Sequence, residues 1–324
     1  MKTENKNAIY GIENPDTSDR RQGMNIYRQL GNIGGVVLFL AIIAGSLTAS
    51  WAGNGGYFVA YNHHIEKGEK EIMLMSDFTR PSKANKEEGQ KDYYSQMLEL
   101  EWAVTDKLAT ELMFEGFEEA GGPKKFTGFR WENRYRLFKD EVPLNPMIYM
   151  EYEHLSHETR FKMETSGWVR PPYTEKEETG EPKDERIMET RFVLSQDFGS
   201  TNVAFNWLNE TDMRNSKTDF GYILAVMHNF VRGGQHHSHG GGSQENNSGG
   251  GRSGGLRLAA VGAEFWGGLG DDRKLDLRPS RQQHYFGPIV MFHMGQKWML
   301  HVSPTFGLSG VSDNLLRIAL GFAL

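Results

Sequence analysis

Stretches of alternating apolar and polar residues recur along the chain after residue 52. Successive side chains of a β-strand point to opposite faces of its sheet, so this pattern predicts strands with one apolar and one polar face. In residues 98–104, four large apolar residues share one face, and Glu99 and Glu101 share the other. In residues 129–137, three aromatic residues and a leucine lie opposite three arginines and a glutamate. Charged residues at this density cannot face a dry protein core.

The alternation predicts about twelve strands, separated by turn residues. No convincing amphipathic helix interrupts them. We expect the strands at residues 72–78, 97–104, 108–115, 129–138, 148–154, 188–195, 202–209, 220–228, 258–266, 285–294, 298–307 and 316–324.

Two β architectures fit this alternation: a soluble sandwich with its charges in solvent, and a transmembrane barrel with its charges in the lumen. If the last strand ends on the periplasmic side, connectors 105–107, 139–145, 197–201 and 295–297 are all periplasmic and short. Connectors 155–185 and 268–283, on the opposite side, are long and charged. Short turns at one end and long loops at the other are typical of outer-membrane barrels. We therefore predict an all-β fold, a single antiparallel transmembrane β-barrel of about twelve strands over residues 72–324, in the bacterial outer membrane.

The segment before the barrel has the features of an export signal. An apolar run at residues 36–47 follows Arg28 and precedes a small-residue site that ends at Ala52, which predicts a signal peptide over residues 1–52. Met24 opens a segment that resembles a signal peptide by itself, so we expect residues 1–23 to be an over-called start. The alternative is an uncleaved anchor helix. Residues 53–71 then form an N-terminal segment that is periplasmic or lumenal. Within it, residues 57–61 look strand-like but lack a partner, which fits a lumen segment, a periplasmic cap or an error in the strand count.

Two short segments resemble known outer-membrane proteins. Residues 317–324 resemble the C-terminal assembly signal of outer-membrane barrels, with Leu324 where phenylalanine is favoured. Residues 98–107 resemble the strand-turn segment E-x-E-Y-G-L-T-D-R of barrel proteins often labelled phenol meta-pathway transporters, with Trp102 and Ala103 in place of its tyrosine and glycine. This resemblance implies a barrel and carries over no functional residue. The partners expected for such a barrel are outer-membrane lipid and the barrel assembly machinery.

Projection of the strands onto a barrel places a set of charged residues on the lumen wall. These are Glu99, Glu101, Glu111, Glu115, Arg130, Glu132, Arg134, Arg136, Glu151, Glu153, Glu189 and Arg191. One interpretation is a ladder of salt bridges that fills and stiffens the barrel, because opposite charges on neighbouring strands attract. The other is a selectivity lining for small ions or polar solutes. Trp102, Trp131, Trp207 and Trp298 project outward, as in an interfacial aromatic girdle.

Composition excludes several other classes. The chain has 324 residues and no cysteine, which excludes disulfide scaffolds, thiolate zinc sites and iron–sulfur clusters. Its formal net charge of -6 argues against nucleic-acid binding. No G-x-S-x-G or H-E-x-x-H spacing is present, and Ser195 is a nucleophile by residue type only, so we expect no enzyme.

Histidines provide the main candidate for a bound ion. His236, His237 and His239 lie in a Gly/Ser-rich insertion at residues 233–254, where they are candidate ligands for a divalent metal. No other cofactor is expected, and the His63–His64 pair is interpreted as a chance surface pair, with metal binding as the alternative. The predicted function is a narrow channel or facilitator for small solutes or ions. The alternatives are a structural barrel, adhesin or sheath for a partner protein, and an outer-membrane enzyme.

Overall fold

The computed structural model describes residues 56–87, 89–156, 166–168, 184–230 and 255–324. In this part of the chain, twelve long antiparallel strands form one closed barrel, together with the two-residue strand β10 (Lys274–Leu275). The long strands are β1 (Lys70–Arg80), β2 (Tyr93–Thr105), β3 (Leu108–Glu119), β4 (Lys124–Arg136), β5 (Met147–Leu155), β6 (Glu185–Phe198), β7 (Thr201–Asp212), β8 (Lys217–Asn229), β9 (Leu256–Asp271), β11 (His284–Met294), β12 (Trp298–Gly307) and β13 (Asn314–Ala323). A short helix α2 (Lys83–Glu87) and a 3₁₀ turn η1 (Pro279–Arg281) lie in connectors.

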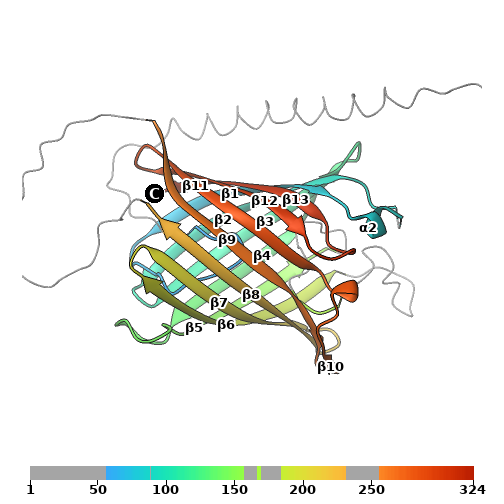
Figure 1. The fold of residues 1–324 in the computed structure, drawn as a ribbon, viewed down its shortest axis with the longest axis horizontal. Helices are drawn as coiled ribbons and strands as arrows, with labels where there is room; N and C mark the ends of the chain where they lie inside the picture. Colours follow the sequence, from blue (N-terminus) through green and yellow to red (C-terminus); the bar gives the residue numbers. More distant parts are fainter. Residues whose placement is uncertain (1–55, 88, 157–165, 169–183, 231–254) are drawn as a thin grey trace, which may run out of the picture. The chain divides into compact units, whose positions relative to one another are not determined.

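The barrel closes where the first strand pairs with the last. β1 and β13 are antiparallel, from Glu71 opposite Ala323 to Arg80 opposite Asn314. β9 pairs with both β8 and β11, so no edge remains among the long strands. The strands run obliquely around the barrel, with the C-terminus at one end and α2 and β10 at the other (Figure 1). A closed barrel leaves no unpaired backbone edge, which is what a strand-built membrane protein requires.

Burial follows the period-two alternation and separates an inner from an outer wall. On β5, Glu151 and Glu153 are buried, whereas Met150, which precedes them, is 49% exposed, and Tyr152 between them is partly exposed. Large apolar side chains are exposed around the outer wall, among them Leu100, Trp102, Leu112, Trp131, Phe192 and Leu224. Trp207 and Trp298 are partly exposed. A closed antiparallel barrel that is polar inside and apolar outside is the architecture of bacterial outer-membrane proteins, as the alternation predicted.

The predicted strands and the observed strands agree in number and order. Each predicted range overlaps one long strand, and most observed strands extend beyond the predicted range. Residues 57–61 form no strand, which removes them from the strand count. The predicted signal peptide at 1–52 and the insertion at 233–254 lie outside the described residues. No helix in the described part of the chain has the length and hydrophobicity needed to cross a membrane.

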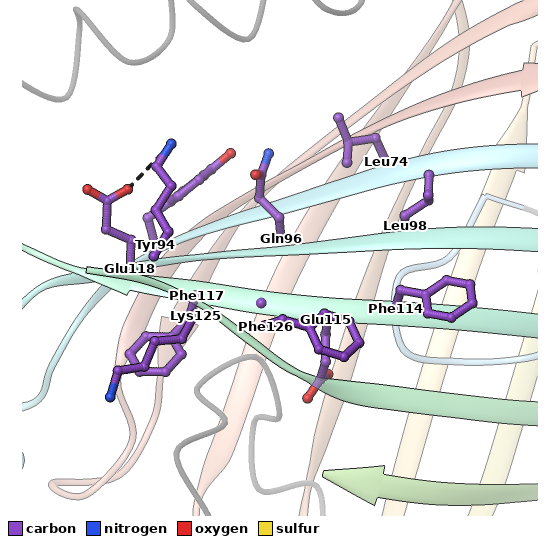
Figure 2. A pocket seen from close by; sticks show the side chains of 12 residues that line it. Leu74, Tyr94, Gln96, Leu98, Phe114, Glu115, Phe117, Glu118, Lys125 and Phe126 are labelled. Carbon is purple, nitrogen blue, oxygen red and sulfur yellow. Dashed lines mark ion pairs between the residues drawn. The ribbon is translucent and has the colours of Figure 1, made fainter. Parts of the chain in front are cut away.

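The wall is irregular where β3 meets β4. The pairing register shifts between Glu115 and Gly116. Gly128 on β4 has a φ of 148°, and a Cβ there would lie 2.2 Å from the carbonyl oxygen of His154, so this position requires glycine. Beside this bulge, a groove of about 380 Å³ is lined by apolar side chains that include Leu98 and Phe114 (Figure 2). The groove lies at the wall of the barrel, away from the peptide segment that occupies the lumen.

Candidate functional site

Residues 57–65, here called the plug segment, run through the interior of the barrel. Tyr57, Phe58, Val59 and Ala60 are all buried, yet none of them belongs to a strand. The polar contacts of the plug segment, Tyr61 included, are with side chains of β4, β6, β7 and β9, which come from much of the circumference of the barrel. The plug segment is therefore held by inward-facing side chains and not by a backbone ladder.

Glu264 on β9 holds the start of the plug segment. Its carboxylate accepts hydrogen bonds from the backbone N–H groups of Phe58 at 3.2 Å, Val59 at 2.8 Å and Ala60 at 2.6 Å. Glu264 is 1% exposed, so these three donors replace the water that it loses on burial. Hydrogen bonds to an ionised acceptor are about twice as strong as neutral ones.

Side chains of β6 and β7 satisfy the next backbone groups of the plug segment. Asn206 accepts from the Tyr61 N–H at 2.7 Å and donates to the Tyr61 carbonyl at 2.9 Å. Arg191 donates to the Val59 carbonyl at 2.6 Å. The phenol of Tyr57 donates to the Asn202 side chain at 3.0 Å, and burial and the nearby Glu264 raise the pKa of Tyr57, which keeps it protonated.

Tyr61 joins the plug segment to the charged ladder. Its hydroxyl donates to Glu132 at 2.5 Å. The guanidinium groups of Arg134 and Arg191 lie 5.1 Å and 5.0 Å from the centre of the Tyr61 ring, within the range of a cation–π contact. The ring also contacts Tyr149, with 4.8 Å between ring centres.

The structure places ten of the twelve predicted lumen residues in three ion-paired groups on the inner wall. Arg130 lies 3.1 Å from Glu115, 3.6 Å from Glu151 and 3.9 Å from Glu153. Arg134 pairs with Glu101, with Glu132 at 2.9 Å and with Glu111 at 4.0 Å, and Arg191 pairs with Glu189. Glu99 is partly exposed. Arg136 lies at the end of β4, partly exposed, and its guanidinium donates to the Lys139 carbonyl at 3.4 Å, so it joins none of the three groups.

Glu151, Glu153 and Glu189 bring three carboxylates within 4.8 Å of one another. All three are buried, an arrangement that could hold a cation. Arg130 approaches two of them and Arg191 pairs with the third, so protein charges already compensate the cluster.

Several inward-facing charges were missing from the predicted set. Glu264 is the most important, and alternation could have found it, because residues 258–266 place it on the same face as Trp266. Arg317 on β13 forms two hydrogen bonds with Asp77 on β1, at 2.7 Å and 2.6 Å, across the seam that closes the barrel. Glu71 on β1 is also buried. What sequence could not supply is the pairing of Glu264 with backbone donors from residues 58–60.

His63 corrects the interpretation of the His63–His64 pair as a surface feature. His63 is fully buried, whereas His64 is exposed. The Nδ1 atom of His63 lies 2.6 Å from the Ser195 hydroxyl, which also accepts the His63 backbone N–H at 2.9 Å. Burial, and then the neighbouring His64, lower the pKa of His63 to about 4, so the imidazole is neutral near pH 7.

Ser195, His63 and Glu141 have the residue types of a hydrolytic triad, but their arrangement argues against hydrolysis. Ser195 is buried, and its hydroxyl oxygen is already engaged by two groups of His63. A nucleophile needs room for a substrate carbonyl about 3 Å away. The serine acts here as a positioning group for the imidazole.

Comparison with known proteins gives similarities of overall structure. No protein-family model matches the chain, and no curated protein matches its sequence. An outer-membrane channel from Pseudomonas putida F1 superimposes with a TM-score of 0.45 at 11% identity, over 83% of this chain and 100% of that one. The KdgM porin in complex with disordered oligogalacturonate gives 0.43 at 8% identity, over 78% and 99%. The NanC porin gives 0.44 at 7% identity, over 78% and 100%. The function of this chain is therefore argued from its own geometry.

Proposed function

We propose that the protein is an outer-membrane channel for small polar solutes or ions and that the plug segment closes its lumen. The observation that carries this proposal is the way in which the plug segment is bound. A few side chains hold it, chiefly Glu264, Asn206 and Arg191, and no strand ladder ties it to the wall. Such a segment can leave the lumen without breaking the barrel.

The strand number supports a lumen that the plug segment is needed to fill. Side chains alone fill a barrel of eight strands, whereas sixteen to eighteen strands leave a water-filled channel. Twelve strands lie between these cases. Withdrawal of the plug segment exposes a passage whose wall is charged.

The sign of that wall supports a preference for cations. Among the described residues, inward-facing carboxylates outnumber guanidinium groups: Glu71, Asp77, Glu111, Glu132, Glu151 and Glu264 are six of the buried acids, against Arg130, Arg134, Arg191 and Arg317. Rings of Asp and Glu are the usual lining of cation-selective pores. The open channel is therefore expected to favour cations over anions.

Planar-bilayer recordings of the refolded barrel test the proposal. The intact protein should open rarely, and a variant that starts at Gly68 and so lacks the plug segment should conduct steadily. In a salt gradient, the reversal potential of this variant should show preference for potassium over chloride. The matched control is deletion of residues 233–254, which removes a segment between strands and leaves the plug segment in place. A folded truncated barrel that never conducts would refute the channel.

The second candidate is a structural barrel, adhesin or sheath for a partner protein. It is supported by the burial of Glu132 and Arg134, whose charged side chains occupy the lumen. An outer-membrane enzyme is the third, and turnover of phospholipid or peptide by the purified barrel would favour it. We propose outer-membrane lipid and the barrel assembly machinery as partners in each case. The resemblance of residues 98–107 to phenol meta-pathway barrels also belongs to this proposal, and this segment forms the end of β2 and the turn that follows it.

A further inference from the structure

Four side chains with metal-binding atoms meet at the end of the barrel where the plug segment leaves the lumen. His63 and His64 belong to the plug segment, Asp197 lies near the end of β6, and Glu141 lies in the connector between β4 and β5. We call these four residues the histidine site. They come from three separate parts of the chain, so their meeting is produced by the fold.

The ligand atoms of His63, His64 and Asp197 have a spacing close to that of a tetrahedral ion, and Glu141 lies beside His63. Zinc bonds to imidazole nitrogen and carboxylate oxygen are about 2.0–2.1 Å, so two ligand atoms of a tetrahedral site lie roughly 3.3 Å apart. Asp197 Oδ2 lies 3.1 Å from His64 Nε2 and 3.8 Å from His63 Nε2. Glu141 Oε1 lies 3.5 Å from His63 Nε2. The ligand atoms of His63, His64 and Asp197 all lie within 4.8 Å of one another.

The buried imidazole provides an independent indication of a ligand. His63 is fully buried, yet its Nε2 atom makes no hydrogen bond, which is costly for a polar atom away from water. That atom is the one directed at Asp197 and Glu141. A bound cation would satisfy it.

Second-layer contacts orient the ligands as they do in known metal sites. The Ser195 hydroxyl engages Nδ1 of His63 at 2.6 Å and so fixes the orientation of the ring; when Ser195 accepts from a protonated Nδ1, Nε2 carries the lone pair that a metal needs. Asn202 donates to Oδ1 of Asp197 at 2.6 Å, which turns Oδ2 toward the imidazoles. Such partners fix the tautomer and the direction of a ligand before the metal arrives.

We propose that His63, His64 and Asp197 bind one divalent transition-metal ion of the zinc class, and that the exposed side chain of Glu141 turns toward the ion as its fourth ligand. Two imidazoles and two carboxylates are donors that zinc accepts, and the imidazoles disfavour calcium and magnesium, which prefer oxygen. Because two ligands lie on the plug segment and two on the barrel, the ion crosslinks the plug segment to the wall. Closure of the lumen by the metal rests on the proposed function, whereas metal binding does not.

Calorimetric titration with zinc chloride tests the site. All proteins carry the deletion of residues 233–254, so that His236, His237 and His239 cannot contribute. The parent should bind one zinc ion per barrel, and His63→Gln and Asp197→Asn should each weaken binding at least tenfold. His64→Gln and Glu141→Gln alter exposed side chains, so they test the site even where the buried change impairs folding. The control His228→Gln changes an exposed histidine near the same end of the barrel and should bind as the parent does. Absence of saturable binding, or equal binding by the parent and His64→Gln, would overturn the proposal.

A labelling experiment tests the crosslink separately. Ala60→Cys places a thiol on the buried plug segment of a chain that has no cysteine, so maleimide reacts only when the segment leaves the lumen. Zinc should slow labelling at least tenfold in the parent and leave it unchanged in the His64→Gln background. Zinc that binds without slowing labelling would refute the crosslink. A barrel that binds zinc but never conducts after removal of the plug segment would refute the channel and leave the metal site standing.

Discussion

Replacement of Glu264 by glutamine should release the plug segment. The carboxylate accepts hydrogen bonds from the backbone N–H groups of three consecutive residues at 2.6–3.2 Å. The isosteric amide of glutamine has no charge, and its NH₂ group cannot accept a hydrogen bond from these N–H groups. A hydrogen bond to a charged group contributes about 1.5–3 kcal/mol and a neutral one about 0.5–1.5 kcal/mol, so each bond weakens by about 1 kcal/mol. Three bonds give about 3 kcal/mol, which is roughly a hundredfold change in the equilibrium between bound and released plug segment.

The assay is maleimide labelling of Ala60→Cys, with and without Glu264→Gln. When opening and closing are fast compared with the reaction, the labelling rate is proportional to the open fraction, so the rate should rise about a hundredfold. Glu87→Gln on α2 is the matched control, because it removes the same charge from an exposed site far from the lumen contacts. Arg317 keeps its two hydrogen bonds to Asp77 in the variant, so assembly should be normal. A labelling rate within a factor of three of the parent would show that Glu264 does not hold the plug segment.

Three further changes have defined outcomes. Phe322→Asp puts a charge beside Trp298 on the outer wall of the closing strand, where a charged residue facing lipid costs up to about 2–4 kcal/mol at mid-membrane. The variant should therefore show less of the heat-modifiable folded band on a gel, and normal migration would count against this orientation of Phe322. Arg134→Met leaves Glu101, Glu111 and Glu132 without their shared cation and should destabilise the barrel by about 3–5 kcal/mol. The folded band on the gel should then convert to the unfolded band at a lower temperature. An unchanged conversion temperature would mean that these ion pairs do not stabilise the barrel. Deletion of residues 233–254 should leave folding intact, because the pairing between β8 and β9 ends at Asn229 and Ala260. The free energy of loop closure changes by only about 0.6 kcal/mol when a loop is halved. Loss of the folded band would show that the segment is a structured part of the barrel.

The fold was predictable because alternate residues of a barrel strand face lipid and the lumen, so their polarity alternates along the sequence. Lipid on one side and a wet lumen on the other impose the alternation seen in Glu99, Leu100 and Glu101, and turn residues mark the strand ends. The strand ends were less predictable. β4 begins at Lys124, ahead of the predicted range, because the bulge at Gly116 and Gly128 interrupts the alternation that marks a strand.

The candidate site was predictable only in part, because the charges on strands follow from the alternation of residues, whereas the contacts of the plug segment do not. The ladder of Arg130, Arg134 and neighbouring glutamates follows from strand parity, and the structure brings those charges together. Residues 57–61 look strand-like in sequence, but their partners are single side chains distant along the chain, so the sequence left a lumen segment as one of three interpretations. His63 looked like a surface residue for the same reason: its burial results from contact with Ser195, far along the chain.

Glu264 also connects the closed state to the selectivity of the open one. In the closed state its charge is compensated by backbone N–H groups of the plug segment, while Arg317 on β13 is engaged by Asp77 across the seam. When the plug segment leaves, those donors leave with it, and the carboxylate must then be solvated by water or a passing cation. Glu264→Gln should therefore have two opposite effects in bilayer recordings: the open probability should rise, and the preference of the open channel for potassium over chloride should fall. Truncation before Gly68 should raise the open probability and keep the preference. A truncated barrel with the same selectivity as its Glu264→Gln variant would show that Glu264 holds the plug segment without contributing to the ion pathway.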